Sequence, residues 1–311
     1  MKRTIYALST LALAIACASR PAKSPEPRPA AEQKDFSTPS DAAHALIGAA
    51  ASYDEPQLLA ILGPDGKVLV ASADAVQDRA RAAAFVAKAQ EKNYVEVDPQ
   101  DPTRATLVVG NDDWPVPIPI TSTDGRWHFD TGAGRDEILQ RRIGANELDV
   151  ITICRGYVEA QEQYASERHD GSDVNQYAER IISTEGKHDG LAWRNDDGSW
   201  GGPVGPAVAK AIEQGYTERT PFHGYYFKIL KGQGRSATLG QLDYLVNGAM
   251  IGGFALAAWP AEYGDTGVKT FIVSYDGVVY EKDLGPSTPE VVAAMDRYDP
   301  DETWKPTHDG W

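Results

Sequence analysis

Cysteine is scarce in this sequence: among 311 residues there are two, Cys17 and Cys154. A chain of this length buries roughly 75% of the surface that its unfolded form exposes, so its core does not depend on a disulfide framework. Cys154 lies on an apolar helical face, which favours a buried, inert thiol over a nucleophile. If Cys17 is modified, no internal disulfide can form.

Basic residues are also in deficit. Lysine and arginine total 30 against 45 aspartate and glutamate residues, which gives a formal net charge of −15. Binding to a nucleic-acid phosphate backbone requires clustered lysine and arginine, so this balance argues against a nucleic-acid partner. It fits a soluble body that anionic surfaces repel.

Sequence motifs of catalysis and cofactor binding are absent too. There is no Gly-x-Ser-x-Gly, His-Glu-x-x-His, Walker loop or dinucleotide-binding fingerprint in the chain. We therefore expect no cofactor. An enzyme is disfavoured rather than excluded, and a binding or scaffolding role is favoured.

The N-terminus has the pattern of an export signal. Two basic residues precede a twelve-residue apolar run that ends at Ala16. This run is too short for a spanning helix but has the length of a signal-peptide core. The segment 13–17 resembles the small-residue box of exported bacterial lipoproteins, although alanine stands where leucine is usual. That resemblance implies a lipidated Cys17 that tethers the protein to the outer membrane on its periplasmic side; ordinary cleavage near Ala16 is the alternative.

Composition and length divide the rest of the chain. Residues 19–35 contain four prolines and no large apolar residue before Phe36, so they read as an extended tether. At this length two domains are the default expectation. The predicted segments are a signal peptide at 1–16, a Pro-rich tether at 17–35, and domains at 36–133 and 134–311.

The first domain shows helix signals before strand signals. Capping residues and prolines open helices at 41–51, 55–62 and 74–92. Strand patterns follow at 94–98, 104–109, 116–123 and 126–130, the last two joined by Asp124-Gly125. Three helices before an antiparallel sheet is an α+β order.

The second domain is built from one long helix and a meander. Residues 134–166 are helix-compatible with a break near Gly144, and a stripe of apolar residues begins at Leu148. The uncharged run 252–259 predicts a strand packed on both faces that Pro260 ends. Asp276-Gly277 between two β-rich runs predicts a type I′ hairpin of fixed register. We expect the helix 146–165 to lay its stripe on this meander.

Shorter elements are expected around these. The patterns predict helices at 177–181, 203–214 and 288–297, and a strand at 223–231.

Several segments resemble known families. The runs 129–131, 141–148, 183–191, 223–230, 253–256 and 278–285 together resemble the uncharacterised bacterial family labelled domain of unknown function 2950. This resemblance spans most of residues 36–306 and implies an envelope location, with no catalytic residues to carry over.

Two looser resemblances concern the fold. The combination of 41–47, Tyr53-Asp54 and 125–129 resembles the NTF2-like, cystatin-related cone, whose members often have a pocket. The helix 146–165 with 224–227 and 271–278 is similar to type IV pilin-like heads. A pilin helix starts at its own membrane-embedded N-terminus, whereas here a whole domain precedes it, so only the head architecture is implied.

Candidate chemistry centres on histidine and aromatic residues. The tripeptide His-Asp-Gly occurs at 169–171, 188–190 and 308–310. Turns in solvent explain the first and last copies. His188 and Asp189 precede apolar residues and, with His223, are the candidates for an envelope hydrolase, because His-Asp pairs can supply acid/base groups.

Ligand and metal candidates are weaker. Tyr225, Trp259 and Tyr263 are the candidates for a ligand groove. The oxygen donors Asp170, Asp173 and Asn175 could hold calcium, but the loop lacks the spacing of an EF-hand, so an acidic turn is favoured and no metal is expected. The expected partner is an envelope protein or small ligand, bound at the pocket of the first domain or the Tyr/Trp-rich loops of the second.

Overall fold

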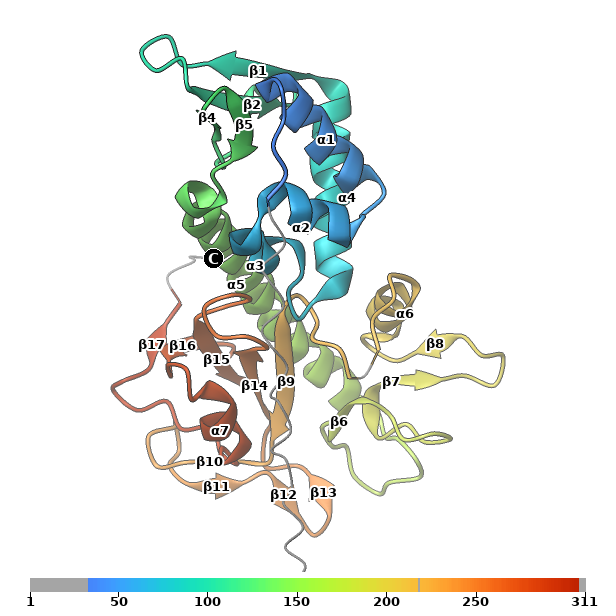
Figure 1. The fold of residues 1–311 in the computed structure, drawn as a ribbon. Helices are drawn as coiled ribbons and strands as arrows, with labels where there is room; N and C mark the ends of the chain where they lie inside the picture. The colour runs from blue at the N-terminus through green and yellow to red at the C-terminus, as the bar shows by residue number, and fades with distance from the viewer. Residues whose placement is uncertain (1–32, 218, 308–311) are drawn as a thin grey trace, which may run out of the picture. The chain divides into compact units, whose positions relative to one another are not determined.

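The computed structural model describes residues 33–217 and 219–307. Over these ranges the chain is an α+β protein, as predicted, with helices and largely antiparallel sheets around two hydrophobic cores (Figure 1). One core lies within residues 36–129 and the other within 150–304. The predicted signal peptide, the predicted lipidation site Cys17, most of the predicted tether and the last His-Asp-Gly lie outside the described residues.

Helices pack against the first sheet because this packing buries their small apolar side chains. The helices are α1 (Pro39–Ala51), α2 (Glu55–Leu62), the 3₁₀ turn η1 (Pro64–Gly66), α3 (Lys67–Val70) and α4 (Ala75–Glu91). The strands are β1 (Asn93–Val97), β2 (Arg104–Val109), β3 (Trp114–Pro115), β4 (Ile120–Thr123) and β5 (Arg126–Phe129), in the order β1-β2-β4-β5 with β3 beside β2. The predicted element order of this half is confirmed.

A single helix, α5 (Thr131–Ala165), takes part in both cores (Figure 1). Asp130 caps its N-terminus by accepting a hydrogen bond from the Ala133 amide. Gly134 lets the helix approach the loop before β4, since a Cβ there would lie 2.5 Å from the Pro117 carbonyl oxygen. The predicted break near Gly144 is wrong, because one glycine costs a helix only about 1 kcal/mol and the surrounding contacts hold it.

The second sheet is antiparallel, in the order β17-β16-β15-β14-β9. Its strands are β9 (Tyr225–Leu230), β14 (Ala255–Pro260), β15 (Lys269–Ser274), β16 (Tyr280–Asp283) and β17 (Lys305–Pro306). Ala255, Leu256 and Ala257 are almost fully buried, as the uncharged run predicted. The apolar stripe of α5 docks on β14 and β15 as expected, although Leu148 is exposed.

The hairpin between β15 and β16 is confirmed, but its predicted register is wrong. Ile272 pairs with Tyr280, whereas a two-residue turn at Asp276-Gly277 would pair Tyr275 with Val278. Only Gly277 of the turn pair has positive φ, and its amide donates to the Ser274 carbonyl. This matches a type I turn followed by a left-handed glycine, which adds one residue to the loop.

Residues 180–213 form a separate layer beside α5, here named the flap (Figure 1). It contains β6 (Arg180–Ile182), β7 (Gly190–Arg194), β8 (Trp200–Gly201) and α6 (Gly205–Glu213). The predicted helix at 177–181 is wrong, since this segment enters β6 and pairs in parallel with β7. Four two-residue strands, β10 (Gly232–Gln233), β11 (Leu242–Asp243), β12 (Leu245–Val246) and β13 (Ala249–Met250), and the helix α7 (Thr288–Ala293) complete the fold.

Candidate functional site

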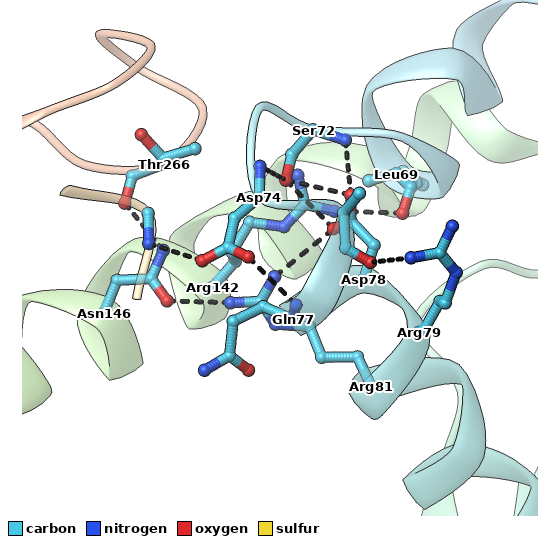
Figure 2. A network of polar contacts seen from close by, with 12 residues as sticks. Leu69, Ser72, Asp74, Gln77, Asp78, Arg79, Arg81, Arg142, Asn146 and Thr266 are labelled. Atoms are coloured by element: carbon cyan, nitrogen blue, oxygen red, sulfur yellow. Dashed lines mark hydrogen bonds and ion pairs between the residues drawn. The ribbon is translucent and has the colours of Figure 1, made fainter. Parts of the chain in front are cut away.

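A buried polar cluster joins the two cores where α4 begins (Figure 2). Asp74 caps α4 by accepting from the Gln77 amide at 3.0 Å. It is only 2% exposed, and it also accepts from the Tyr216 hydroxyl at 3.2 Å and the Gly224 amide at 2.8 Å. One carboxylate therefore ties the start of α4 to the segment that leads into β9.

The turn at 222–225 brings its backbone close to Asp74. His223 and Gly224 both have positive φ, and Phe222 and Tyr225 exchange both backbone hydrogen bonds, as in a type I′ turn. A Cβ on Gly224 would lie 2.6 Å from the Asn146 side-chain nitrogen. Glycine is therefore required there on two counts, backbone conformation and space.

Arg142 of α5 is the second part of the buried polar cluster that contains Asp74, and we name this cluster the joint. The side chain is buried, and its guanidinium donates to the Val68 and Leu69 carbonyls and pairs with Asp265. Asn146, one turn further along α5, donates to the Thr266 carbonyl and accepts from Arg81 at 2.7 Å. Buried charges are stable only when paired in this way.

Burial shifts the pKa values of Asp78, Arg81 and Glu262, which lie in or beside the joint. It raises the pKa of Asp78 above the usual aspartate value, despite hydrogen bonds from Ser72 that favour the charged form. Burial lowers the pKa of Arg81, and the nearby Arg142 charge lowers it further. Glu262 has a raised pKa because it is partly buried and lies beside Asp265.

A groove lies between the flap and the part of the second half formed by α5 and the second sheet. Its volume is about 840 Å³, within the range of roughly 300–1,000 Å³ that small-molecule sites occupy. Helix α5 forms one wall through Ile153 and Gly156, and α6 faces it with Val208 and Ile212. Phe227 and Leu256 of the second sheet line it as well.

The groove is present because the apolar face of α6 does not pack against α5. The helix packs on β7 and β8 instead, and Ile212 remains 42% exposed. On the opposite wall Gly156 is exposed, and a Cβ there would meet nothing within 4 Å. Polar side chains such as Thr184, Arg194 and Thr217 also line the groove, and all three are exposed.

The structure places His188 and Asp189 at the end of the flap. The His188 amide donates to the Asp170 carboxylate, and its carbonyl accepts from the Tyr164 hydroxyl. The Asp189 carboxylate accepts from the Thr184 amide and hydroxyl, which keep its pKa low although partial burial opposes them. The backbone of His188 and the side chain of Asp189 are therefore both engaged in holding the turn at 184–189.

His223 lies at a different level of α5. Its Nδ1 is 2.6 Å from the Asp149 carboxylate and 3.1 Å from the Gln77 side chain. Asp149 and Tyr164, which contact His223 and His188 respectively, are separated by about 22 Å along the helix axis at 1.5 Å per residue. The structure does not bring the three hydrolase candidates into one site.

The aromatic candidates divide between core and edge. Tyr225 is fully buried and its hydroxyl donates to the Lys269 carbonyl, so it belongs to the core of the second half. Trp259 lies beside Tyr226, with ring centroids 5.8 Å apart. The Tyr263 hydroxyl donates to Asp283. Neither lines the groove.

The loop at 170–175 uses its donors on the protein itself. Asp170 accepts from the His188 amide, and the Asn175 side chain donates to the Ala165 carbonyl; Asp173 is exposed. No cluster of three or more His, Cys, Asp or Glu residues suited to a metal occurs in the described ranges. Cys154 is buried, as predicted, and burial raises the pKa of its thiol to about 12.

Sequence reasoning missed the joint and the groove. One signal for the joint was present: Ile138, Arg142, Asn146 and Val150 follow each other at i+4 spacing, so two polar residues interrupt an apolar row. That interruption marks where α5 passes between the cores. No local pattern marks the groove, because its walls come from segments far apart in the chain.

Fold and site together define an α+β protein with a polar joint and an open apolar groove. A family model described as "Protein of unknown function (DUF2950)" matches residues 33–307, and the chain belongs to this family. Comparisons with curated proteins and with solved structures each find no match. No helix within the described ranges has the length and apolar character to cross a membrane.

Proposed function

We propose that this protein binds a molecule with a long hydrocarbon chain in the groove between α5 and α6. The observation that carries the proposal is the groove itself, about 840 Å³ with mostly apolar walls. The strands and helices that form it pair their own backbone groups, so few donors face the ligand. A ligand that fits must therefore have few polar groups along its buried length.

The polar head of such a ligand would lie at the exposed side chains of the lining. Thr184, Arg194 and Thr217 are exposed there, and the Arg194 guanidinium lies over the Trp200 ring at 4.2 Å. Each methylene buried contributes about 0.8 kcal/mol. A chain of several methylenes therefore supplies most of the affinity, and the head group contributes little.

The experiment uses two matched substitutions on one helix. Gly156 lines the groove and Gly144 does not, yet neither has a heavy atom within 4 Å of an added Cβ. Gly156→Leu should fill the groove, displace about two methylenes of ligand and weaken binding of a dansylated C11 fatty acid about 15-fold. Gly144→Leu should bind as the wild type does.

The outcome that contradicts the proposal is equal affinity of both variants for the fluorescent fatty acid. Competition by palmitate and by a lysophospholipid separates two sources of the chain. Stronger displacement by palmitate would indicate free fatty acids, and stronger displacement by the lysophospholipid would indicate membrane lipids. Displacement by neither would contradict hydrocarbon binding.

We further propose that binding occurs in the bacterial envelope, where the protein is exported and held by a lipidated Cys17. The support is the basic, apolar and small-residue pattern of residues 2–17. Mass spectrometry of the mature N-terminus decides between the alternatives. A diacylglyceryl mass on Cys17 supports the anchor, whereas an unmodified Cys17 or cleavage after it overturns it.

Two finer aspects of the fold are part of this proposal. Helices α1, α2 and α4 against an antiparallel sheet are compatible with an NTF2-like arrangement. Helix α5 across an antiparallel five-stranded sheet is compatible with a pilin-like head. An experimental structure that superposes each half on such a fold would support the likeness, and failure to superpose would refute it.

A further inference from the structure

The first sheet ends at β1, a strand with a free outer side (Figure 1). In the order β1-β2-β4-β5, this strand pairs with β2 and has no second neighbour among the described residues. Its faces are open as well, since four of its five residues are exposed and Val95 is half-buried. Tyr94 is 40% and Val97 is 45% exposed. Strand edges of this kind are templates for pairing with another chain.

The free side of β1 presents the backbone groups of three residues. The Asp98 amide donates to the Arg104 carbonyl of the neighbouring strand. Because hydrogen-bonded pairs alternate along an antiparallel ladder, the even-numbered residues of β1 direct their backbone groups to β2. Asn93, Val95 and Val97 therefore direct their amides and carbonyls outward. Within the described ranges, these outward groups have no hydrogen-bond partner.

A second copy of β1 matches this edge in an antiparallel arrangement. The pairing that overlaps all five residues places Val95 opposite Val95 of the second copy and Asn93 opposite Val97. These are the outward-facing residues, so the two edges exchange about six hydrogen bonds, two for each hydrogen-bonded pair. A pairing centred on Glu96 places two glutamates directly opposite each other, which is destabilising. A pairing centred on Tyr94 moves Val97 beyond the end of the partner strand.

The side chains of the two edges are complementary in the pairing centred on Val95. Tyr94 lies opposite Glu96 of the second copy, and Lys92 lies opposite Asp98. Opposite charges that face each other across two strands stabilise the pair. Lys92 also contacts Asp113 of its own chain, but an ammonium group has three donors and can bridge two carboxylates.

We propose that two copies of this chain associate edge to edge through β1 and join their first sheets into one continuous antiparallel sheet. The contact is built on a five-residue strand, so the interface is small and the dimer is transient. Each copy carries a net charge of −15, and the repulsion between them also limits the affinity. The contact shares no residue with the groove, so it is independent of hydrocarbon binding.

Sedimentation equilibrium of the full chain tests the association. The chain carries Cys17→Ser, which leaves the buried Cys154 as its one native thiol. At about 0.15 M salt the repulsion is screened beyond about 8 Å. The average mass should rise from one chain towards two as the concentration increases to about 0.5 mM, where even a dissociation constant near 1 mM leaves a measurable dimer fraction. A mass of one chain throughout would overturn the proposal.

Two substitutions at one position test whether β1 is the contact. Val95→Pro removes an outward amide and no hydrogen bond to β2, so the variant should fold. It should raise the dissociation constant of the dimer at least about tenfold, because the symmetric contact loses two hydrogen bonds. Val95→Ala keeps the amide and should associate nearly as the wild type does. Equal dissociation constants for the two variants would overturn the assignment to this edge.

Cysteine cross-linking tests the register without a proline. In the proposed pairing, Tyr94 and Glu96 of the second copy have Cα atoms about 4.5 Å apart, within disulfide range. Two copies of the same residue, 94 with 94 or 96 with 96, are roughly 7–8 Å apart, which is too far. The proteins with Tyr94→Cys and Glu96→Cys should therefore cross-link with each other on oxidation far more than either does with itself. Equal self-linking of one variant, or no cross-link in the mixture, would overturn the pairing.

Discussion

Asp74→Ala should destabilise the protein far more than an ordinary helix-cap substitution. The substitution removes the cap of α4, which contributes about 1 kcal/mol. It also leaves the Tyr216 hydroxyl and the Gly224 amide without their acceptor in a buried site. Each orphaned donor costs about 1–3 kcal/mol. We expect a total loss of about 3–5 kcal/mol in the free energy of unfolding, after partial rehydration.

Asp54→Ala is the matched control. Asp54 caps α2 by accepting from the Gln57 amide at 3.1 Å, much as Asp74 accepts from the Gln77 amide. The hydrogen bonds of Asp54 differ from those of Asp74, because they are exposed and all go to Gln57 of the same helix. Its loss should cost about 1 kcal/mol. Urea unfolding of both variants gives the comparison. If Asp74→Ala costs no more than Asp54→Ala, the joint does not hold the two cores together.

Three further predictions concern single groups. In a Cys17→Ser variant, Cys154 should resist iodoacetamide at pH 8, because its thiol is buried and burial raises its pKa to about 12. It should react once urea unfolds the chain. Labelling of Cys154 in the folded protein would contradict this prediction. Burial raises the pKa of Asp78, so its contribution to stability is present below about pH 4 and is lost as pH rises through the folded pKa. The stability of Asp78→Asn relative to wild type should therefore improve from pH 4 to 7, and a flat difference in urea unfolding would refute it. Gly144→Ala should stabilise α5 by about 0.5–1 kcal/mol, raising the thermal midpoint, since the site is open; a lower midpoint would contradict it.

Local signals predicted most elements of the fold. The helices α1, α2 and α4 and the strands β2 and β5 lie where caps, prolines and alternation indicated. The uncharged run of β14 was recognised as core because a central strand is buried on both faces. The register of the β15–β16 hairpin was missed because Asp-Gly fits both a two-residue turn and a type I turn with a bulge.

Long-range contacts explain what the sequence did not reveal. Arg142 and Asp74 have ordinary local roles, one in a helix and one at a cap, and their partners lie 70–150 residues away. The groove depends on where the flap settles against α5. The sequence suggested His188 and His223 as members of one acid/base set, yet they contact separate levels of α5.

Photocrosslinking is the most direct test of whether the groove binds a hydrocarbon chain. A C16 fatty acid with a diazirine on its chain would be irradiated with the full-length protein and the modified peptides mapped by mass spectrometry. We predict modification on α5 near Ile153–Tyr157 and on α6 near Val208–Ile212, and its loss in Gly156→Leu. Modification confined to other surfaces, or none above an unfolded control, would contradict it.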